Sequence, residues 1–119
     1  FVPGTDPCVV RVAGVDVALA ICEDLWQDGG PVAQVREVHA GLLVVINGSP
    51  YEVHKDDTRL ALASRRAVEA GAALAYVNMV GGQDELVFDG DSLVVGPDGA
   101  RPAHRHPDRH RAADLPRCP

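Results

Sequence analysis

The sequence has a single lysine, three cysteines and few aromatic residues, which make up 4% of its 119 positions. The cysteines form no Cys-x-x-Cys pair and no histidine lies at metal-ligand spacing, so neither a disulfide framework nor a zinc site is predicted. No signal peptide is predicted within these residues, and no apolar run in them is long enough to span a membrane. We therefore expect a cytoplasmic protein without a membrane partner.

An excess of basic charge is also absent. Seventeen acidic residues outnumber 11 basic ones and give a net charge of −6, which argues against a nucleic-acid partner. At 119 residues the chain is at most one domain, and its apolar fraction of 46% can supply a core. The first residue is Phe1, and nothing resembling a start precedes the first predicted strand. We therefore expect an interior piece of a longer protein.

The stretch that organises the chain is Val15–Trp26. Its apolar part, which ends at Ile21, is short and rich in β-branched residues, and this indicates a buried strand. Cys22 follows directly, at the strand end where open α/β sheets place reactive side chains. A free cysteine at the end of an apolar run is, however, most often a small core residue. On these residues alone, the core interpretation of Cys22 is favoured.

Apolar periodicity and chain breakers predict the other elements. The expected strands are Cys8–Val12 and Val15–Ile21 in a hairpin, a central parallel strand, a further buried strand, and a final hairpin-like pair: Leu42–Ile46, Ala75–Val80, and Leu86–Phe88 with Ser92–Val95. One helix begins at Pro31 with the apolar stripe Val32, Val35 and Val38, and ends before Gly41. The other spans Thr58–Ala70 and ends at Gly71. This order indicates an α/β fold with a mixed sheet.

The sequence also predicts helix caps and turns. We expect Asp56 or Asp57 to cap the second helix. We expect His39 at the end of the first helix, facing its dipole. Turns are predicted at 81–82 and at 97–99.

Three predicted strands end in polar turns, which hold Cys22, the segment 47–49 and Asn78. Such convergence of strand ends is how α/β enzymes build a site. It favours a functional role for Cys22 over a purely structural one.

A cysteine nucleophile needs a thiolate, a proton shuttle and an oxyanion donor. The backbone N–H of Glu23, next to Cys22, is a candidate oxyanion donor. The negative charges of Glu23 and Asp24 disfavour a thiolate unless they point away or are paired, so a nearby cation is expected. Lys55 is the only lysine, and a papain-like pair of Cys22 with His54 is the alternative.

Three segments together resemble the nitrilase, or carbon-nitrogen hydrolase, superfamily. They are Ile-Cys-Glu-Asp-Leu-Trp at 21–26, Asn-Gly-Ser-Pro at 47–50 and the long segment at 76–92. Within that superfamily, Cys-Glu-Asp-Leu-Trp combined with Gly-Gly-Gln-Asp-Glu-Leu-Val-Phe-Asp-Gly is similar to the glutaminase domain of glutamine-dependent NAD synthetases. The resemblance covers residues 8 to 100.

The resemblance implies a fragment of an α-β-β-α sandwich, with residues 1–100 as the C-terminal portion of a glutaminase domain. Cys22 matches the nucleophile of a Glu-Lys-Cys triad, which attacks the side-chain amide of glutamine and forms a thioester. Ser49 matches the turn that holds glutamine, and Lys55 lies near it.

The resemblance also implies partners outside this chain. Ammonia passes to a synthetase domain, where ATP and magnesium serve to activate nicotinate adenine dinucleotide, and no cofactor is expected within this chain. Members of the family assemble into homo-oligomers, so a homo-oligomer is expected here too.

The chain departs from the family pattern in two places. The general-base Glu and the catalytic Lys of the family precede the cysteine, and nothing before Cys22 matches them, since Lys55 lies after it. The loop Gly81–Glu85 is followed by strand-like residues instead of a helix, so no phosphate cradle is predicted. We therefore expect this chain to be inactive alone. Another nitrilase-type amidase, and a non-catalytic interaction module with Cys22 in its core, are the alternative functions.

Residues 101–119 have a different composition, with three of the five histidines, five of the ten arginines and four of the nine prolines. Leu115 is their only large aliphatic residue, so they cannot add a packed element. We predict a disordered, solvated tail. Metal binding by the histidines and a shifted reading frame are the alternatives.

Overall fold

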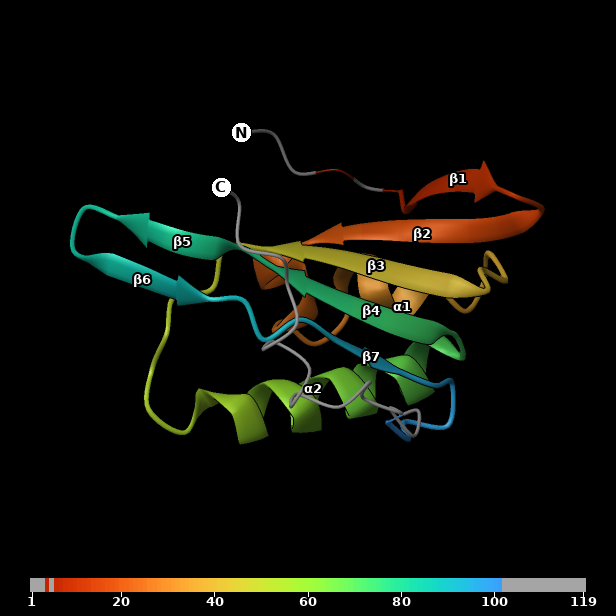
Figure 1. The fold of residues 1–119 in the computed structure, drawn as a ribbon. Coiled ribbons are helices and arrows are strands. Elements are labelled where there is room, and N and C mark those ends of the chain that lie inside the picture. Colours follow the sequence, from red (N-terminus) through yellow and green to blue (C-terminus); the bar gives the residue numbers. More distant parts are fainter. Residues whose placement is uncertain (1–3, 5, 102–119) are drawn as a thin grey trace, which may run out of the picture.

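The computed structural model describes Gly4 and residues 6–101. Its centre is a five-stranded sheet in the order β1-β2-β3-β4-β7 (Figure 1). The strands are β1 Cys8–Val12, β2 Val15–Ile21, β3 Leu42–Asn47, β4 Ala73–Asn78 and β7 Leu93–Val95. The pairs β2–β3 and β3–β4 are parallel, and the two edge strands pair antiparallel. The predicted mixed α/β sheet, with a central parallel strand, is confirmed.

The hairpin predicted for β1 and β2 is also confirmed, because Val12 pairs with Val15 across its turn. Ala13 and Gly14 both have positive φ angles, 48° and 83°. Two such residues give a turn whose twist matches that of the strands it joins. The Ala-Gly pair thus fixes where the chain reverses before β2.

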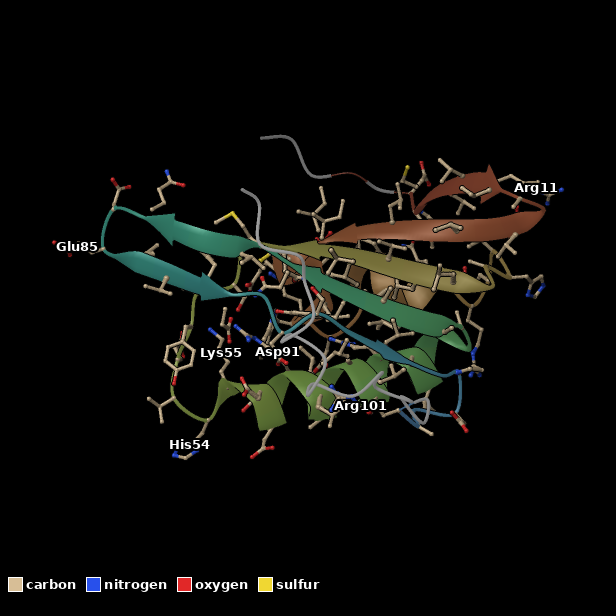
Figure 2. All side chains as sticks on the ribbon, in the orientation of Figure 1. Arg11, His54, Lys55, Glu85, Asp91 and Arg101 are labelled. Carbon is tan, nitrogen blue, oxygen red and sulfur yellow. The ribbon has the colours of Figure 1, made fainter. Side chains whose placement is uncertain are left out.

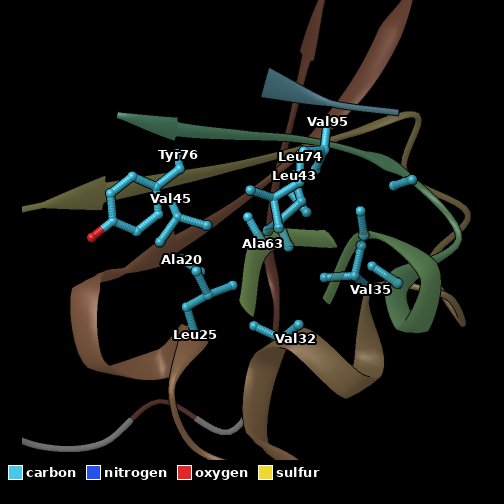
Figure 3. Close-up of a cluster of buried hydrophobic side chains, with 14 of the residues drawn as sticks. Ala20, Leu25, Val32, Val35, Leu43, Val45, Ala63, Leu74, Tyr76 and Val95 are labelled. Carbon is cyan, nitrogen blue, oxygen red and sulfur yellow. The ribbon is translucent and has the colours of Figure 1, made fainter. Parts of the chain in front are cut away.

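The helices lie on one face of the sheet (Figure 1). They are the 3₁₀ turn η1 Cys22–Leu25, the short α1 Gly30–Gln34 and the long α2 Lys55–Ala70. Alternate residues of the strands point toward these helices, as the period of two requires. The core between the sheet and the helices (Figure 3) includes Ala20, Leu25, Val32, Val35, Leu43, Val45, Ala63, Ala67, Leu74, Tyr76 and Val95.

The opposite face of the sheet is apolar and exposed. Ile21 is 69% exposed, Ile46 56%, Val77 45% and Val94 49%. Parallel strands are normally covered on both faces, yet the described helices cover only one of them. The sandwich implied by the sequence places a second sheet on such a face, and that sheet is not formed by residues 6–101.

The first helix is shorter than predicted. α1 ends at Gln34, and successive turns continue to His39, with i to i+3 bonds such as Glu37 N–H to Gln34 O at 3.0 Å. Val32 and Val35 are buried, but Val38 is 38% exposed. His39, with a φ of 53°, ends these turns and lies five residues beyond the end of α1, so its predicted place at the helix end is wrong. The chain leaves the helix early because it must turn back to enter β3.

The second helix begins at Lys55, three residues before the predicted start. His54, with a φ of 65°, occupies the cap position, so the predicted capping by Asp56 or Asp57 is wrong. Both aspartates lie in the first turn, where their charge suits the positive end of the helix dipole. Gly71, with a φ of 65°, ends the helix as predicted.

The turn predicted at 81–82 lies instead inside a strand. β5 Val80–Gln83 pairs with β6 Leu86–Asp89, and this two-stranded hairpin projects from the main sheet (Figure 1). Asp84, with a φ of 54°, and Glu85 form the turn. The predicted pairing of 86–88 with 92–95 is therefore wrong, because β7 pairs with β4. Local sequence could not separate the two positions, since both glycine and aspartate are common in turns.

The turn at 97–99 is confirmed by a bond from Gly99 N–H to Gly96 O at 2.9 Å. The tail predicted at 101–119 lies outside the described residues except for Arg101. Within the described part, no helix combines the length and apolar character needed to cross a membrane.

Candidate active site

The ends of β2, β3 and β4 lie in register at one edge of the sheet. Ile21 pairs with Ile46, Ile46 pairs with Val77, and Asn47 pairs with Asn78. The residues that follow these pairs therefore leave the sheet together. The predicted convergence of the three polar turns is confirmed.

Cys22 is the first residue beyond β2 and has a φ of 45°. A β-carbon makes this left-handed conformation unfavourable by roughly 1–2 kcal/mol, so the surrounding turn must enforce it. The turn is closed by N–H donors from Trp26 and Gln27 to the carbonyl of Glu23, at 3.0 and 3.3 Å. Cys22 is half-buried in this turn, so it is neither a core residue nor fully exposed.

The two carboxylates after Cys22 have different surroundings. The Asp24 carboxylate accepts a hydrogen bond from Ile21 N–H at 2.9 Å, so it folds back on the strand end. Glu23 is exposed and borders the same pocket as Cys22. The backbone N–H of Glu23 belongs to the first turn of η1, where N–H groups have no acceptor within the turn.

All four predicted site residues border one open pocket of about 510 Å³. The lining comprises Cys22, Glu23, Trp26, Gly48, Ser49, Pro50, Glu52, Val53, His54, Lys55 and Thr58. Two of the three converging turns thus supply its walls, and the start of α2 closes it. A cavity of this size is large enough for a small molecule, and its lining mixes charged and polar side chains with the apolar Trp26, Pro50 and Val53.

Lys55 is the one lysine of the chain, and its side chain is 17% exposed. Its Nζ lies 2.6 Å from Oε1 of Glu52, which also borders the pocket. The ammonium group is therefore tied to the pocket wall. It supplies positive charge on the pocket wall formed by the start of α2, whereas Cys22 lies on the wall formed by the end of β2.

His54 borders the pocket too, but its ring points away from the body of the molecule (Figure 2). The side chain is exposed, and in the described part of the chain no hydrogen bond joins it to Cys22. The papain-like pairing of Cys22 with His54 gains no support from this geometry. Across residues 6–101, no three His, Cys, Asp or Glu side chains cluster closely enough to hold a metal ion.

Ser49 is held in place through its main chain. Its N–H donates to Asn78 Oδ1 at 2.9 Å, and its carbonyl accepts from Asn78 Nδ2 at 3.1 Å. Both residues are buried, with exposures of 7% and 6%. Asn78 in turn donates its own N–H to Ser92 Oγ at 2.9 Å. The end of β4 therefore fixes the turn that follows β3.

Two buried arginines of α2 were not predicted as site residues. Arg59 is 0% and Arg66 is 1% exposed. Arg59 donates twice to Asp89, at 3.1 and 2.9 Å, and this partnership lowers the pKa of the Asp89 carboxyl. The sequence held a signal for both arginines, because they share the helical spacing 59, 63, 66, 70 with Ala63 and Ala70.

Comparison with known proteins identifies the class. The family model for carbon-nitrogen hydrolases matches residues 1–109. The chain belongs to the carbon-nitrogen hydrolase family.

Its relatives include glutamine-dependent NAD(+) synthetases. The chain is 53% identical over 97 residues to that of Xanthomonas campestris, covering 82% of this chain and 17% of the relative. It is 43% identical over 99 residues to that of Aquifex aeolicus, covering 83% and 18%. The chain thus spans under one fifth of the length of these relatives.

Solved structures agree with this grouping. The glutamine-dependent NAD+ synthetase of Acinetobacter baumannii, in complex with ADP, superposes with a TM-score of 0.77 at 37% identity, covering 85% of this chain and 19% of that one. An amidase of the nitrilase superfamily from Nesterenkonia superposes at 0.67 and 35% identity, covering 85% and 38%. That amidase structure shows the acetamide moiety of fluoroacetamide added covalently at the active site cysteine.

Proposed function

We propose that this chain is the nucleophile-bearing part of a glutaminase domain in a glutamine-dependent NAD synthetase. One observation carries the proposal: Cys22, Ser49 and Lys55 border a single pocket at the converging ends of parallel strands. The identity of 53% to a named synthetase supports the choice of glutamine as the amide.

In this proposal the Cys22 thiolate attacks the side-chain amide carbon of glutamine. A C–S bond forms, and the general base holds the proton taken from the thiol. The tetrahedral adduct then collapses, the C–N bond breaks, and that proton passes to the nitrogen, which leaves as ammonia. Water then attacks the thioester, releases glutamate and returns the thiol. The Glu23 N–H, one of the free donors of the first turn of η1, stabilises the oxyanion of both adducts.

Ser49 and Lys55 bind the substrate. The Lys55 ammonium pairs with a carboxylate of the ligand, and the buried Ser49 turn presents polar groups at the pocket wall. The general-base Glu and the catalytic Lys of the triad come from residues outside this chain, because Lys55 is its only lysine and no Glu precedes Cys22.

The released ammonia goes to a synthetase domain of the same protein, where ATP and magnesium support the amidation of nicotinate adenine dinucleotide. The whole protein is then a ligase of NAD biosynthesis. We place it in the cytoplasm as a homo-oligomer. The ADP complex of the Acinetobacter baumannii neighbour supports a nucleotide site in that relative.

The test uses the full-length gene product that carries this chain. Cys22→Ala should abolish glutamine-dependent NAD synthesis and leave synthesis from added ammonia intact. Cys8→Ala is the matched control, because Cys8 is an exposed free cysteine on the edge strand β1 and should be silent in both assays. Glutamine-dependent synthesis that survives in Cys22→Ala would refute the proposal.

A second candidate is a simple amidase of the same family. The Nesterenkonia amidase, with a TM-score of 0.71 in a further structure at 34% identity, favours it. Full-length protein that hydrolyses acetamide or butyramide faster than glutamine would decide for the amidase.

A further inference from the structure

Helix α2 carries Arg59 and Arg66, which are seven residues apart and therefore nearly two helical turns apart on one face. Their exposures of 0% and 1% are unusual for arginine, which is rarely fully buried unless paired. A buried guanidinium group destabilises a core unless its N–H donors are hydrogen-bonded. Their partners therefore show what they do.

Arg59 bonds to the segment that follows β3. Its Nη2 donates to the carbonyl of Ser49 at 3.2 Å and to that of Pro50 at 3.3 Å. Its Nη1 donates to both carboxylate oxygens of Asp89, at the end of β6. Ser49 and Pro50 border the pocket. Arg59 therefore fixes the backbone that carries Ser49, the proposed substrate-binding residue.

Arg66 bonds to the segment that follows β2. Its Nε donates to the carbonyl of Leu25 at 2.8 Å, and its Nη2 donates to the carbonyl of Gln27. Its Nη1 pairs with Glu69 one turn along the helix at 2.6 Å. Leu25 ends the 3₁₀ turn that begins at Cys22, so Arg66 fixes the far end of the nucleophile turn.

Both arginines donate to main-chain carbonyls. These hydrogen bonds fix the path of the backbone itself. The guanidinium fork can bond several carbonyls at fixed angles, whereas a lysine ammonium is a single point charge on a flexible stem. The strained φ of 45° at Cys22 needs such external support. One helix thereby sets the position of both walls of the pocket.

We propose that Arg59 and Arg66 are positioning residues with separate tasks: Arg59 holds the substrate turn at 48–50, and Arg66 holds the nucleophile turn at 22–25. This inference rests on the proposed function for its kinetic consequences. Arg59 then governs glutamine binding, while Arg66 governs the reactivity of Cys22.

The experiment compares Arg59→Lys, Arg66→Lys and the control Arg65→Lys in the full-length gene product. Arg65 lies on the same helix, but its side chain is 59% exposed, and its one ion pair among the described residues is with Asp28, at 3.7 Å. Asp28 also lies 3.4 Å from Arg66. Three readouts are used: KM and kcat for glutamine, the rate of Cys22 alkylation by iodoacetamide, and backbone deuterium uptake in peptides covering 22–28 and 47–54.

Arg59→Lys should raise KM about tenfold, as expected for losing roughly 1.4 kcal/mol of hydrogen bonding to the turn. Deuterium uptake should rise at 47–54 only, and alkylation should stay unchanged. Arg66→Lys should lower kcat and the alkylation rate by about tenfold, with faster uptake at 22–28 only. Arg65→Lys should match the wild type throughout.

Equal effects of both variants on KM, kcat and alkylation would overturn the proposal, because a general loss of stability moves all of them together. Unchanged uptake in both peptides would overturn it as well. If either lysine variant fails to accumulate, Asp89→Asn and Glu69→Gln weaken the same two anchors while keeping the arginines, and the same crossed pattern is expected. Absence of glutamine hydrolysis by the wild type would refute only the proposed function, since alkylation and uptake need no glutamine.

Discussion

Asn78 holds Ser49 by both of its main-chain polar groups, accepting from the N–H at 2.9 Å and donating to the carbonyl at 3.1 Å. The two residues are 29 positions apart, at the ends of neighbouring parallel strands. A side-chain amide is suited to this task because it offers an acceptor and a donor on one rigid plane. The turn that carries the proposed substrate residue is thus built on β4 as much as on β3.

We predict that Asn78→Asp weakens glutamine binding. The aspartate keeps the acceptor for Ser49 N–H but turns the donor into a charged oxygen facing the Ser49 carbonyl, which costs about 1–3 kcal/mol in a buried place. KM for glutamine should rise at least tenfold. Synthesis of NAD from added ammonia should be unaffected, and it serves as the control in the same preparation. A variant with wild-type KM would contradict the role given to this clamp.

The Arg59–Asp89 pair predicts a response to acid. Bonding to Arg59 holds the pKa of Asp89 below its ordinary value of 3.8. A lowered carboxyl pKa adds stability that is present above pH 3.8 and is lost as the pH falls through the lower folded value. Deuterium uptake at 47–54, corrected for intrinsic exchange, should therefore rise progressively below pH 3.8 in the full-length protein.

Asp89→Asn provides the comparison for that experiment. Its amide does not titrate in this range, so uptake at 47–54 should already be raised at neutral pH and should change less on acidification. Parallel pH profiles for the two proteins would show that another group controls the turn.

The conformation of Cys22 predicts a difference in stability between two inactive variants. Cys22→Gly should be more stable than Cys22→Ala by about 1 kcal/mol, because glycine adopts a φ of 45° without the clash of a β-carbon. Urea denaturation of the full-length protein measures the difference. Ala61→Gly, on the exposed side of α2, is the control and should lose about 1 kcal/mol. Equal stability of the two Cys22 variants would mean that the turn is not strained there.

The uncovered face of the sheet predicts that residues 1–119 alone are poorly soluble. Ile46→Thr should raise the soluble yield of the isolated chain, since Ile46 is 56% exposed there. The same change should destabilise the full-length protein by about 1–3 kcal/mol, because the second sheet of the sandwich would bury it. Val68→Thr, 48% exposed on α2, should change neither. Cooperative melting of the unmodified isolated monomer would contradict this prediction.

Local sequence was enough for β1, β2, β3 and the position of Cys22, but it placed β4 two residues too late, at 75–80, and missed β5. Short β-branched runs define β2, β3 and β4, and the end of each run marks where a side chain can leave the sheet. Because parallel strands align their ends, the convergence of Cys22, Ser49 and Asn78 follows from those runs. The family pattern added the assignment of Cys22 as nucleophile, since a free cysteine taken alone is more often a core residue.

Only the tertiary structure decided which side chains hold these turns. Arg66 reaches a carbonyl 41 residues away in sequence, and Arg59 an acid 30 residues away. Periodicity records which residues face the core but not which loop a buried donor meets, because that depends on how the helix lies across the sheet. The glycines at 81–82 failed as a turn signal for the same reason: their backbone freedom permits a turn, and pairing with β6 makes them a strand.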